Sequence, residues 1–180
     1  GLRSLDGRPL TAELAAREVR VGDEPFVQAV VRDMTERRER EERLRLSRRA
    51  MDEAAVGITV TDPSRPDNPL TYANDEFLRL TGYDRSFALG RNPRFVQCED
   101  TDPEAVARIR EAVDREESVE VTILNERADG DRWWNALEVT PVHDADGALT
   151  AYIGFQRDVT EEVRRTNTFE HLHDATERLQ

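Results

Sequence analysis

The pattern of apolar and polar positions changes character near residue 56. Residues 36–55 (ERREREERLRLSRRAMDEAA) contain no glycine or proline and carry many Glu–Arg pairs at helical spacing, with a sparse apolar stripe through Leu44, Met51 and Ala55. This pattern predicts a largely solvent-facing helix. It suits either a plain linker or a two-chain coiled coil that transmits a signal, and too few clean heptads are present to decide between them.

After residue 56 the pattern is that of short strands and short helices. Two β-branched runs (GITVTD and LTYAN) flank a proline-rich loop, two helical segments follow (DEFLRLTGY and TDPEAVARIREAV), and three strands close the domain (SVEVTILNE, DRWWNALEVTPV and TAYIGFQRDV). This order predicts an α+β fold with a five-stranded antiparallel sheet and helices on one face. Residues 161–180 are polar, and we expect them to form a C-terminal helix.

Residues 6–36 resemble residues 129–161, which indicates a partial internal repeat. Each segment runs from Asp-Gly through a strand, a turn and a second strand to a charged helix start. The second copy is preceded by a complete set of elements, whereas the first copy is not. We therefore interpret residues 1–35 as the C-terminal fragment of an upstream domain of the same type. The remaining divisions are a linker helix at 36–55, the complete domain at 56–160, and a helix at 161–180 that leads to an output domain.

Composition excludes several classes of function. The net charge of −12 over 180 residues opposes nucleic-acid binding by this segment, because phosphate contacts need clustered cations. All 26 basic residues are arginine, and an acid-rich, lysine-free chain favours a salt-adapted source. The apolar runs are too short to span a membrane, and a single cysteine suits a reducing compartment, so we expect a cytoplasmic protein. The sequence contains no nucleophile–base pair and no metal-ligand cluster that would predict an enzyme.

Two carboxamides of the closing strands, Asn125 and Asn135, point by strict alternation the way the apolar residues of their strands point. In the third strand Gln156 falls on the face of Tyr152 and Gly154, while Ile153 and Phe155 take the other side. Buried amides need hydrogen-bond partners, which either one another or a ligand supplies. Three amides on adjacent strands favour a small uncharged ligand with a donor–acceptor edge, such as an imide or a pyrimidine. Arg94 and Arg110 are expected at the rim, either as surface ion-pair partners or as a phosphate site.

The stretch GRNPRFVQ (residues 90–97), followed by Asn125, Asn135 and Gln156, resembles the flavin-binding signature of light–oxygen–voltage (LOV) domains, a branch of the PAS superfamily. NDEFLRLTGYDR and the closing DVTEE fit the same family, and the resemblance covers about residues 50–160. It implies the PAS/LOV fold, flanked by N- and C-terminal helices. It also implies a flavin cofactor, FMN in the first place, with FAD or riboflavin as alternatives.

The resemblance assigns a role to each matching residue. It implies ribityl contacts from Asn92 and Gln97, phosphate contacts from Arg94 and Arg110, pyrimidine contacts from Asn125 and Asn135, a contact from Gln156 to the ring atoms N5 and O4, and ring walls at Ile58, Leu137 and Phe155.

One departure from the family pattern bears on mechanism. Pro93 stands where the family has the cysteine whose sulfur bonds to the excited flavin. Cys98, five residues further along a helix, is rotated by about 500° and should face elsewhere. The implied mechanism is therefore photoreduction of the flavin to the neutral semiquinone, with Gln156 switching its hydrogen bond and passing the signal to the flanking helices. The aromatic residues that could donate the electron are Tyr72, Tyr83, Tyr152, Trp133 and Trp134.

Two alternatives remain open on the sequence alone. Pro93 also suits a degenerate PAS module that serves dimerisation or linkage and binds no cofactor, and a PAS pocket for another small metabolite is the third interpretation. In each case we expect a homodimer through residues 36–55 and an output domain in the same polypeptide. The final residues FEHLHDATERLQ resemble the corresponding part of archaeal bacterio-opsin-activator-like regulators.

Overall fold

A computed structural model describes residues 2–3, 9–21 and 24–166 of the chain. The chain divides into two compact units, Gly1–Ala50 and Met51–Gln180, which we call the N-terminal and the C-terminal unit. Among the described residues, no helix is long and apolar enough to cross a membrane. The two units are described separately below.

The N-terminal unit contains a long antiparallel hairpin. Strands β3 (Ala12–Val21) and β4 (Glu24–Asp33) pair along their whole length, and β1 (Leu2–Arg3) pairs with β2 (Pro9–Leu10). Helix α1 (Thr35–Asp52) begins directly after β4 and buries none of its residues. The solvent-facing helix expected at 36–55 is therefore present, and it ends three residues earlier than expected.

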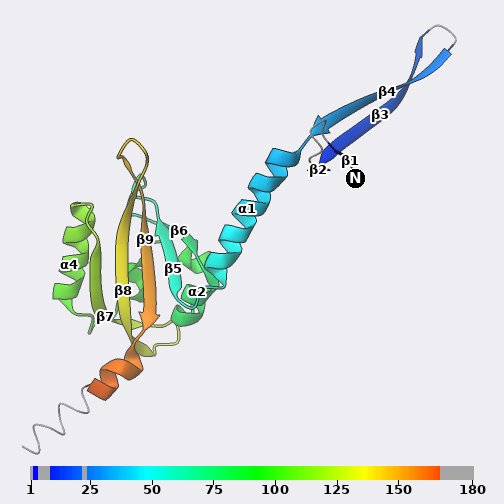
Figure 1. Cartoon of the computed structure of the whole chain (residues 1–180). Coiled ribbons are helices and arrows are strands. Elements are labelled where there is room, and N and C mark those ends of the chain that lie inside the picture. Colours follow the sequence, from blue (N-terminus) through cyan, green and yellow to red (C-terminus); the bar gives the residue numbers. More distant parts are fainter. Residues whose placement is uncertain (1, 4–8, 22–23, 167–180) are drawn as a thin grey trace, which may run out of the picture. The chain divides into compact units, whose positions relative to one another are not determined.

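The C-terminal unit is built on a five-stranded antiparallel sheet in the order β6-β5-β9-β8-β7 (Figure 1). The strands are β5 (Gly57–Thr61), β6 (Leu70–Ala73), β7 (Val119–Glu126), β8 (Arg132–His143) and β9 (Leu149–Asp158). The first and the last strand in sequence lie side by side in the middle of the sheet. The predicted α+β class, strand order along the chain and antiparallel sheet are confirmed.

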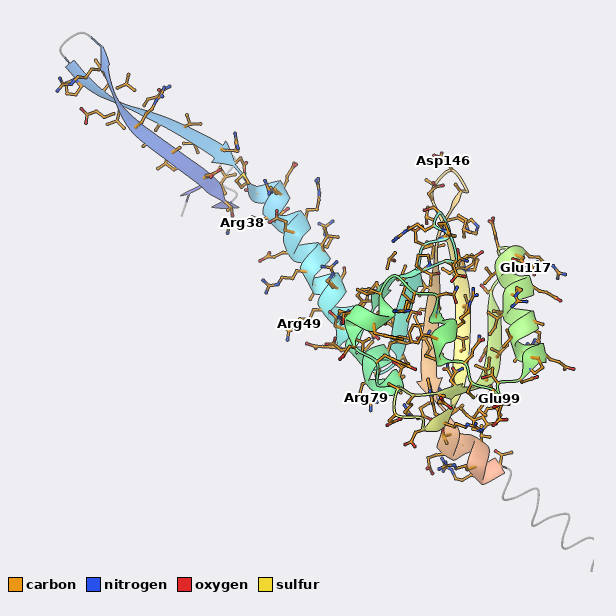
Figure 2. All side chains as sticks on the ribbon, turned by 180° about the vertical axis from the view of Figure 1, so that it is seen from behind. Arg38, Arg49, Arg79, Glu99, Glu117 and Asp146 are labelled. Carbon is orange, nitrogen blue, oxygen red and sulfur yellow. The ribbon has the colours of Figure 1, made fainter. Side chains whose placement is uncertain are left out.

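The helices between β6 and β7 are more numerous than the sequence predicted. They are α2 (Asp75–Thr81), α3 (Arg85–Ala88), the 3₁₀ turn η1 (Pro93–Val96) and α4 (Pro103–Asp114). Figure 1 shows α4 beside β7, on which it packs, while α2 packs against β5. The charged residues labelled in Figure 2 in this unit, Arg79, Glu99, Glu117 and Asp146, are exposed at its periphery.

Local signals explain where the two main helices begin and end. Asn74 caps α2 by accepting from the backbone N–H of Phe77 (2.9 Å), and α2 ends at Gly82, whose φ of 73° suits glycine. Helix α4 begins with Asp102 as cap and Pro103 in the first turn. The side chain of Asn74 is fully buried and also donates to the carbonyl groups of Met51 and Val56, so it ties the start of this unit to the sheet.

The core consists of two clusters rather than one. One cluster lies under α2 and α3 and contains Leu70, Ala73, Phe77 and Ala88. The other lies between α4 and the sheet and contains Ala105, Val121 and Ile123. The sheet continues from one cluster to the other, and the candidate site lies against it. After β9, residues 160–166 are helical, while most of the helix expected at 161–180 lies outside the described residues.

Candidate functional site: an amide-floored cavity

A cavity of about 590 Å³ lies between the sheet and the helical layer of the C-terminal unit. The lining includes side chains from β5, β7, β8, β9, η1 and α4, and from the loop between β5 and β6. The structure brings most of the predicted site residues to it: Asn92, Pro93, Arg94, Gln97, Arg110, Asn125, Asn135, Leu137 and Gln156. Residues more than sixty positions apart in sequence thus meet in one place.

Ile58 and Phe155 are not among the residues that line the cavity. The two are paired across β5 and β9, next to the pair formed by Thr59 and Gly154. Successive residues of a strand point to opposite faces, so Thr59 and Gly154 face the cavity while Ile58 and Phe155 face away from it. The expectation that Ile58 and Phe155 form walls of the site is therefore corrected; Gln156 and Phe155 are neighbours and cannot both face inward.

Asn125 and Asn135 form a pair on the floor of the cavity. Each side chain is 2% exposed, and the Nδ2 group of Asn135 donates to Oδ1 of Asn125 over 3.0 Å. Nδ2 of Asn125 donates in turn to the backbone carbonyl of Leu124 (3.1 Å). Oδ1 of Asn135 is buried without a hydrogen-bond partner. The pair therefore satisfies itself only in part.

Gln156 completes the floor and is 4% exposed. Its Nε2 group donates to the hydroxyl of Thr59 (3.0 Å), whereas its Oε1 atom is buried without a partner. A Cβ atom on Gly154 would lie 2.6 Å from the Thr59 hydroxyl oxygen and 2.7 Å from Nε2 of Gln156. Glycine at 154 therefore makes room for the Gln156 amide itself.

The unpartnered atoms of the floor describe the ligand that would suit it. A buried acceptor without a partner costs about 1–3 kcal/mol, and Asn135 and Gln156 each present one. The indole N–H of Trp133, which also lines the cavity and is 1% exposed, is a buried donor without a partner. A flat heterocycle with both N–H and carbonyl groups on its edge would satisfy such a mixed set.

The mouth of the cavity is charged and exposed. Arg65, Arg94 and Arg110 line it together with Asp67 and Asp114. The guanidinium of Arg94 contacts the Asp67 carboxylate, and its Nε donates to Oδ1 of Asn92 (3.2 Å). Arg110 is exposed on α4, four residues before Asp114. Three arginines against two acids leave a cationic excess where a ligand's anionic end would emerge.

Pro93 occupies the first turn of η1 and lines the cavity. The side chain of Asn92 caps this turn by accepting from the backbone N–H of Arg94 (3.0 Å). Because the first residues of a helical turn need no N–H donor, proline fits here without distorting the turn. The expected position of Pro93 at the start of a short helical turn is confirmed, and the Pro93 side chain carries no nucleophile.

Cys98 does not line the cavity. Its backbone N–H donates to the Thr101 hydroxyl (2.8 Å), which lies 3.5 Å from its sulfur and donates to the Leu124 carbonyl (2.7 Å). Cys98 lies outside the cavity lining for a reason other than the helical rotation expected from its place in the sequence. Since η1 ends at Val96, no continuous helix sets the direction of Cys98.

The structure distinguishes among the five aromatic residues that the sequence offered as possible electron donors. Trp133 and Tyr152 line the cavity, whereas Tyr72, Tyr83 and Trp134 do not. The Tyr152 hydroxyl donates to the Val113 carbonyl (2.6 Å), and burial raises the pKa of Tyr152. Tyr152 shares its face with Gln156 by alternation, which was the available signal for it as a wall residue.

Comparisons with known proteins agree with this site. Residues 55–161 match the family model of the PAS domain. A bacterioopsin transcriptional activator of Halobacterium salinarum is 35% identical over 149 residues, which cover 83% of this chain and 22% of that protein. A blue-light-activated histidine kinase of Brucella ovis is 40% identical over 118 residues, which cover 66% of this chain and 24% of that protein. The chain thus spans less than a quarter of the length of either relative.

Solved structures of similar fold point the same way. The LOV domain of a blue-light-activated histidine kinase from Erythrobacter litoralis is 44% identical, with a TM-score of 0.58 over 60% of this chain and 99% of that one. An RNA-binding light–oxygen–voltage receptor is 35% identical, with a TM-score of 0.70 over 96% of this chain and 46% of that one. The chain belongs to the PAS domain family and, within it, to the LOV branch.

Proposed function

We propose that the C-terminal unit is a blue-light sensor domain that holds a flavin in the amide-floored cavity and works without a cysteinyl adduct. The observation that carries the proposal is the pair of buried, unpartnered amide oxygens on Asn135 and Gln156, beside a cavity large enough for a flavin ring. The imide edge of a flavin offers an N–H and carbonyl groups to the asparagine amides, whereas N5 and O4 of the ring would accept from the Gln156 amide once its Nε2 group turns toward them. The similar proteins described as blue-light-activated support the same proposal.

Each part of the cavity matches one part of the ligand. Asn125 and Asn135 would hold the pyrimidine edge, Gln156 would face N5 and O4, and Leu137 would contact the ring. Asn92 and Gln97 would bind the ribityl chain, and Arg94 and Arg110 would bind a terminal phosphate. Since the arginines line the mouth and exceed the acids there, we favour FMN over riboflavin; FAD would have to extend past the mouth into solvent.

A bound flavin would supply blue absorption and one-electron chemistry. Pro93 has no atom that can bond to the ring, and the Cys98 sulfur belongs to a residue outside the cavity lining. Without an adduct, the flavin would supply light-driven one-electron chemistry, with Trp133 or Tyr152, which line the cavity, as candidate electron donors and with a proton taken up at N5. The change at N5, from hydrogen-bond acceptor to donor, would favour Oε1 over Nε2 of Gln156 as the facing atom.

Thr59 allows the Gln156 amide to turn at low cost. Its hydroxyl accepts from Nε2 of Gln156 (3.0 Å) and lies 3.4 Å from the Gly154 carbonyl. A hydroxyl both donates and accepts, so Thr59 can pair with either end of the amide. It would donate to Oε1 while Nε2 faces an accepting N5, and it accepts from Nε2, as in this structure, when Oε1 faces the ring. Two residues further along β9, Asp158 accepts from the backbone N–H of Thr160 (2.9 Å), where the C-terminal helical segment begins. The switch therefore has a short covalent path to that segment.

The first experiment is the visible absorption spectrum of the purified protein, in the dark and during blue illumination. A structured flavin band that gives way to a one-electron-reduced spectrum is the expected result. A thiol-adduct spectrum would contradict the route without an adduct, and the absence of a band after adding FMN would favour a PAS module that binds no cofactor. Pro93→Cys should restore adduct formation, whereas Pro93→Ser, as its matched control, should not.

A second experiment tests the switch. Hydrogen exchange over residues 160–166 should change on illumination in the wild type and should not change in Gln156→Leu with flavin bound. An unaltered light response in Gln156→Leu would exclude the Gln156 switch and leave flavin binding untouched. Gln156→Glu serves as a control that keeps the shape of the side chain.

The proposal includes an assembly. We expect a homodimer through α1, whose side chains are unburied in the single chain, and an output domain in the same polypeptide. Sedimentation of the chain with and without residues 36–50 tests the dimer; an unchanged mass would contradict it.

A further inference from the structure

The end of β9 carries a distinctive set of hydrogen bonds. Oδ1 of Asp158 accepts from the N–H of Thr160 (2.9 Å), and the Thr160 hydroxyl accepts from the N–H of Trp134 (2.9 Å). The N–H of Val159 donates to the carbonyl of Trp134 (2.9 Å). These bonds fasten the start of the C-terminal helical segment to the beginning of β8.

The end of β4, in the other unit, carries the same set. Oδ1 of Asp33 accepts from the N–H of Thr35 (2.9 Å), and the Thr35 hydroxyl accepts from the N–H of Thr11 (3.0 Å). The N–H of Met34 donates to the carbonyl of Thr11 (2.7 Å). Each donor and acceptor has its counterpart, so the sequence repeat is also a structural repeat.

The strand registers agree when the two sets are matched. The pair Ala12–Asp33 corresponds to Asn135–Asp158, and the pair Leu14–Val31 corresponds to Leu137–Gln156. The match extends to a third strand, because the pair Leu2–Leu10 of β1 and β2 falls on Asn125–Trp133 of β7 and β8. Strands β1 to β4 thus reproduce the pairing of β7, β8 and β9.

The two copies differ in what covers them. Val31 is 61% exposed and Val27 is 74% exposed, whereas the corresponding Gln156 and Tyr152 are 4% exposed. Leu14 is 63% exposed, whereas Leu137 is half-buried. In the complete copy, β9 pairs with β8 along one edge and with β5 along the other, and the helical layer covers the face that carries Leu137. A two-stranded hairpin with an apolar face is at best marginally stable in water, so the N-terminal hairpin calls for the same cover.

We infer that residues 2–35 are the last three strands of a second PAS-like unit that does not recognise a flavin. The occupant of its apolar face is a preceding part of the same polypeptide, equivalent to residues 57–118, which adds a strand along β4 and a helical layer over Val31, Leu14 and Val27. At the positions of the floor amides Asn125, Asn135 and Gln156, this unit has Leu2, Ala12 and Val31. All three positions that correspond to the floor amides therefore carry apolar residues.

The replacement of the three floor amides by apolar residues decides which class of ligand the N-terminal unit could bind. The side chains of leucine, alanine and valine neither donate nor accept hydrogen bonds, so no side chain at these positions can pair with an imide edge. The inner face of the completed N-terminal unit would therefore suit an apolar ligand or side chains of its own core. The two units would then divide the work: one senses light and the other transmits or scaffolds. This ligand assignment rests on the flavin function proposed for the C-terminal unit, whereas the structural repeat does not.

Flavin stoichiometry in the full-length polypeptide tests the ligand assignment. One flavin per chain is expected in the wild type, and none in the Asn135→Leu/Gln156→Leu double variant. A flavin retained by that variant would overturn the assignment, because the N-terminal unit would then bind it. Two flavins per wild-type chain would overturn it as well. If the wild type takes up none, the proposed function of the C-terminal unit fails, and the test of cover described next still applies.

Matched substitutions test the cover. Val31 faces the proposed inner layer and its neighbour Val30, 56% exposed, faces the opposite side of the hairpin. Val31→Asp should lower the thermal midpoint of the full-length polypeptide by several degrees more than Val30→Asp does, and should leave the 180-residue chain nearly unchanged. Amides of β4 should exchange more slowly in the full-length polypeptide than in the 180-residue chain. Equal effects of the two substitutions would overturn the proposed cover. Slow hydrogen exchange of the β4 amides in a dimer of the 180-residue chain would also overturn it, because a second copy of the chain would then be the occupant.

Discussion

The floor and the mouth of the cavity both present polar side chains, but in opposite states. The floor amides Asn125, Asn135 and Gln156 are 2–4% exposed, and two of their oxygens lack partners. At the mouth Arg94 and Arg110 are exposed, and Arg94 already contacts Asp67. Water satisfies the mouth whether or not a ligand is bound, whereas the floor gains hydrogen bonds only from a ligand. Affinity should therefore depend mainly on the floor, and the choice between flavins on the mouth.

The largest effect is expected on the floor. Asn135→Leu removes both the donor to Asn125 and the unpartnered oxygen, and should weaken flavin binding by about 100-fold, or about 3 kcal/mol. Fluorescence titration of the flavin-free protein measures the affinity, and circular dichroism checks the fold. Thr122→Val, on an exposed position of the same sheet, is the control. Wild-type affinity in Asn135→Leu would show that the floor does not bind the ligand.

A smaller and more selective effect is expected at the mouth. Arg110→Gln should weaken FMN binding by about 10-fold, or about 1.4 kcal/mol, and leave riboflavin binding unchanged, since only FMN carries a phosphate. Added salt should reduce the FMN preference of the wild type. Arg108→Gln, on the same helix and with its guanidinium at the Glu120 carbonyl, is the control. Equal losses for FMN and riboflavin would contradict the division between floor and mouth.

The stability contributed by Asp158, at the end of the strand that carries Gln156, should depend on pH. Burial alone would raise the pKa of Asp158, but hydrogen bonds from Thr160 and Arg127 outweigh it and hold the pKa below its ordinary value. The ionised Asp158 carboxylate therefore stabilises the folded state fully above about pH 4, and this contribution is lost as the pH falls through the lowered pKa of Asp158. Asp158→Asn should cost about 1 kcal/mol at neutral pH. Thermal melts should show the difference from wild type shrinking at acid pH; a difference independent of pH would exclude this role.

The smallest effect is expected for the only thiol. Cys98→Ser should leave the dark spectrum, the illuminated spectrum and the recovery rate unchanged, because Cys98 does not line the cavity. Spectra recorded side by side with the wild type provide the measurement. A changed photoproduct would mean that the sulfur reaches the ligand and that floor and mouth do not account for the whole site.

Much of this protein could be predicted from local pattern. Alternation along β7, β8 and β9 placed Asn125, Asn135 and Gln156 on the inner face, because side chains of a strand repeat with a period of two. The same rule excludes Phe155, next to Gln156, and a family comparison that ignores the alternation assigns it wrongly. Helix α3 was not predicted, because so short an element depends on packing more than on its own sequence. A helix was expected to run from Pro93 to Cys98, whereas η1 ends at Val96.

The sequence by itself determined the order of strands along the chain, the inward amides, the missing cysteine and the repeat that links residues 6–36 to 129–161. Only the tertiary structure decided which of those amides are satisfied. The Nε2 group of Gln156 donates to the Thr59 hydroxyl, 97 residues away, while the Oε1 atom has no partner. Hydrogen-bond partners of buried groups are set by register between distant strands, and no local pattern contains that register.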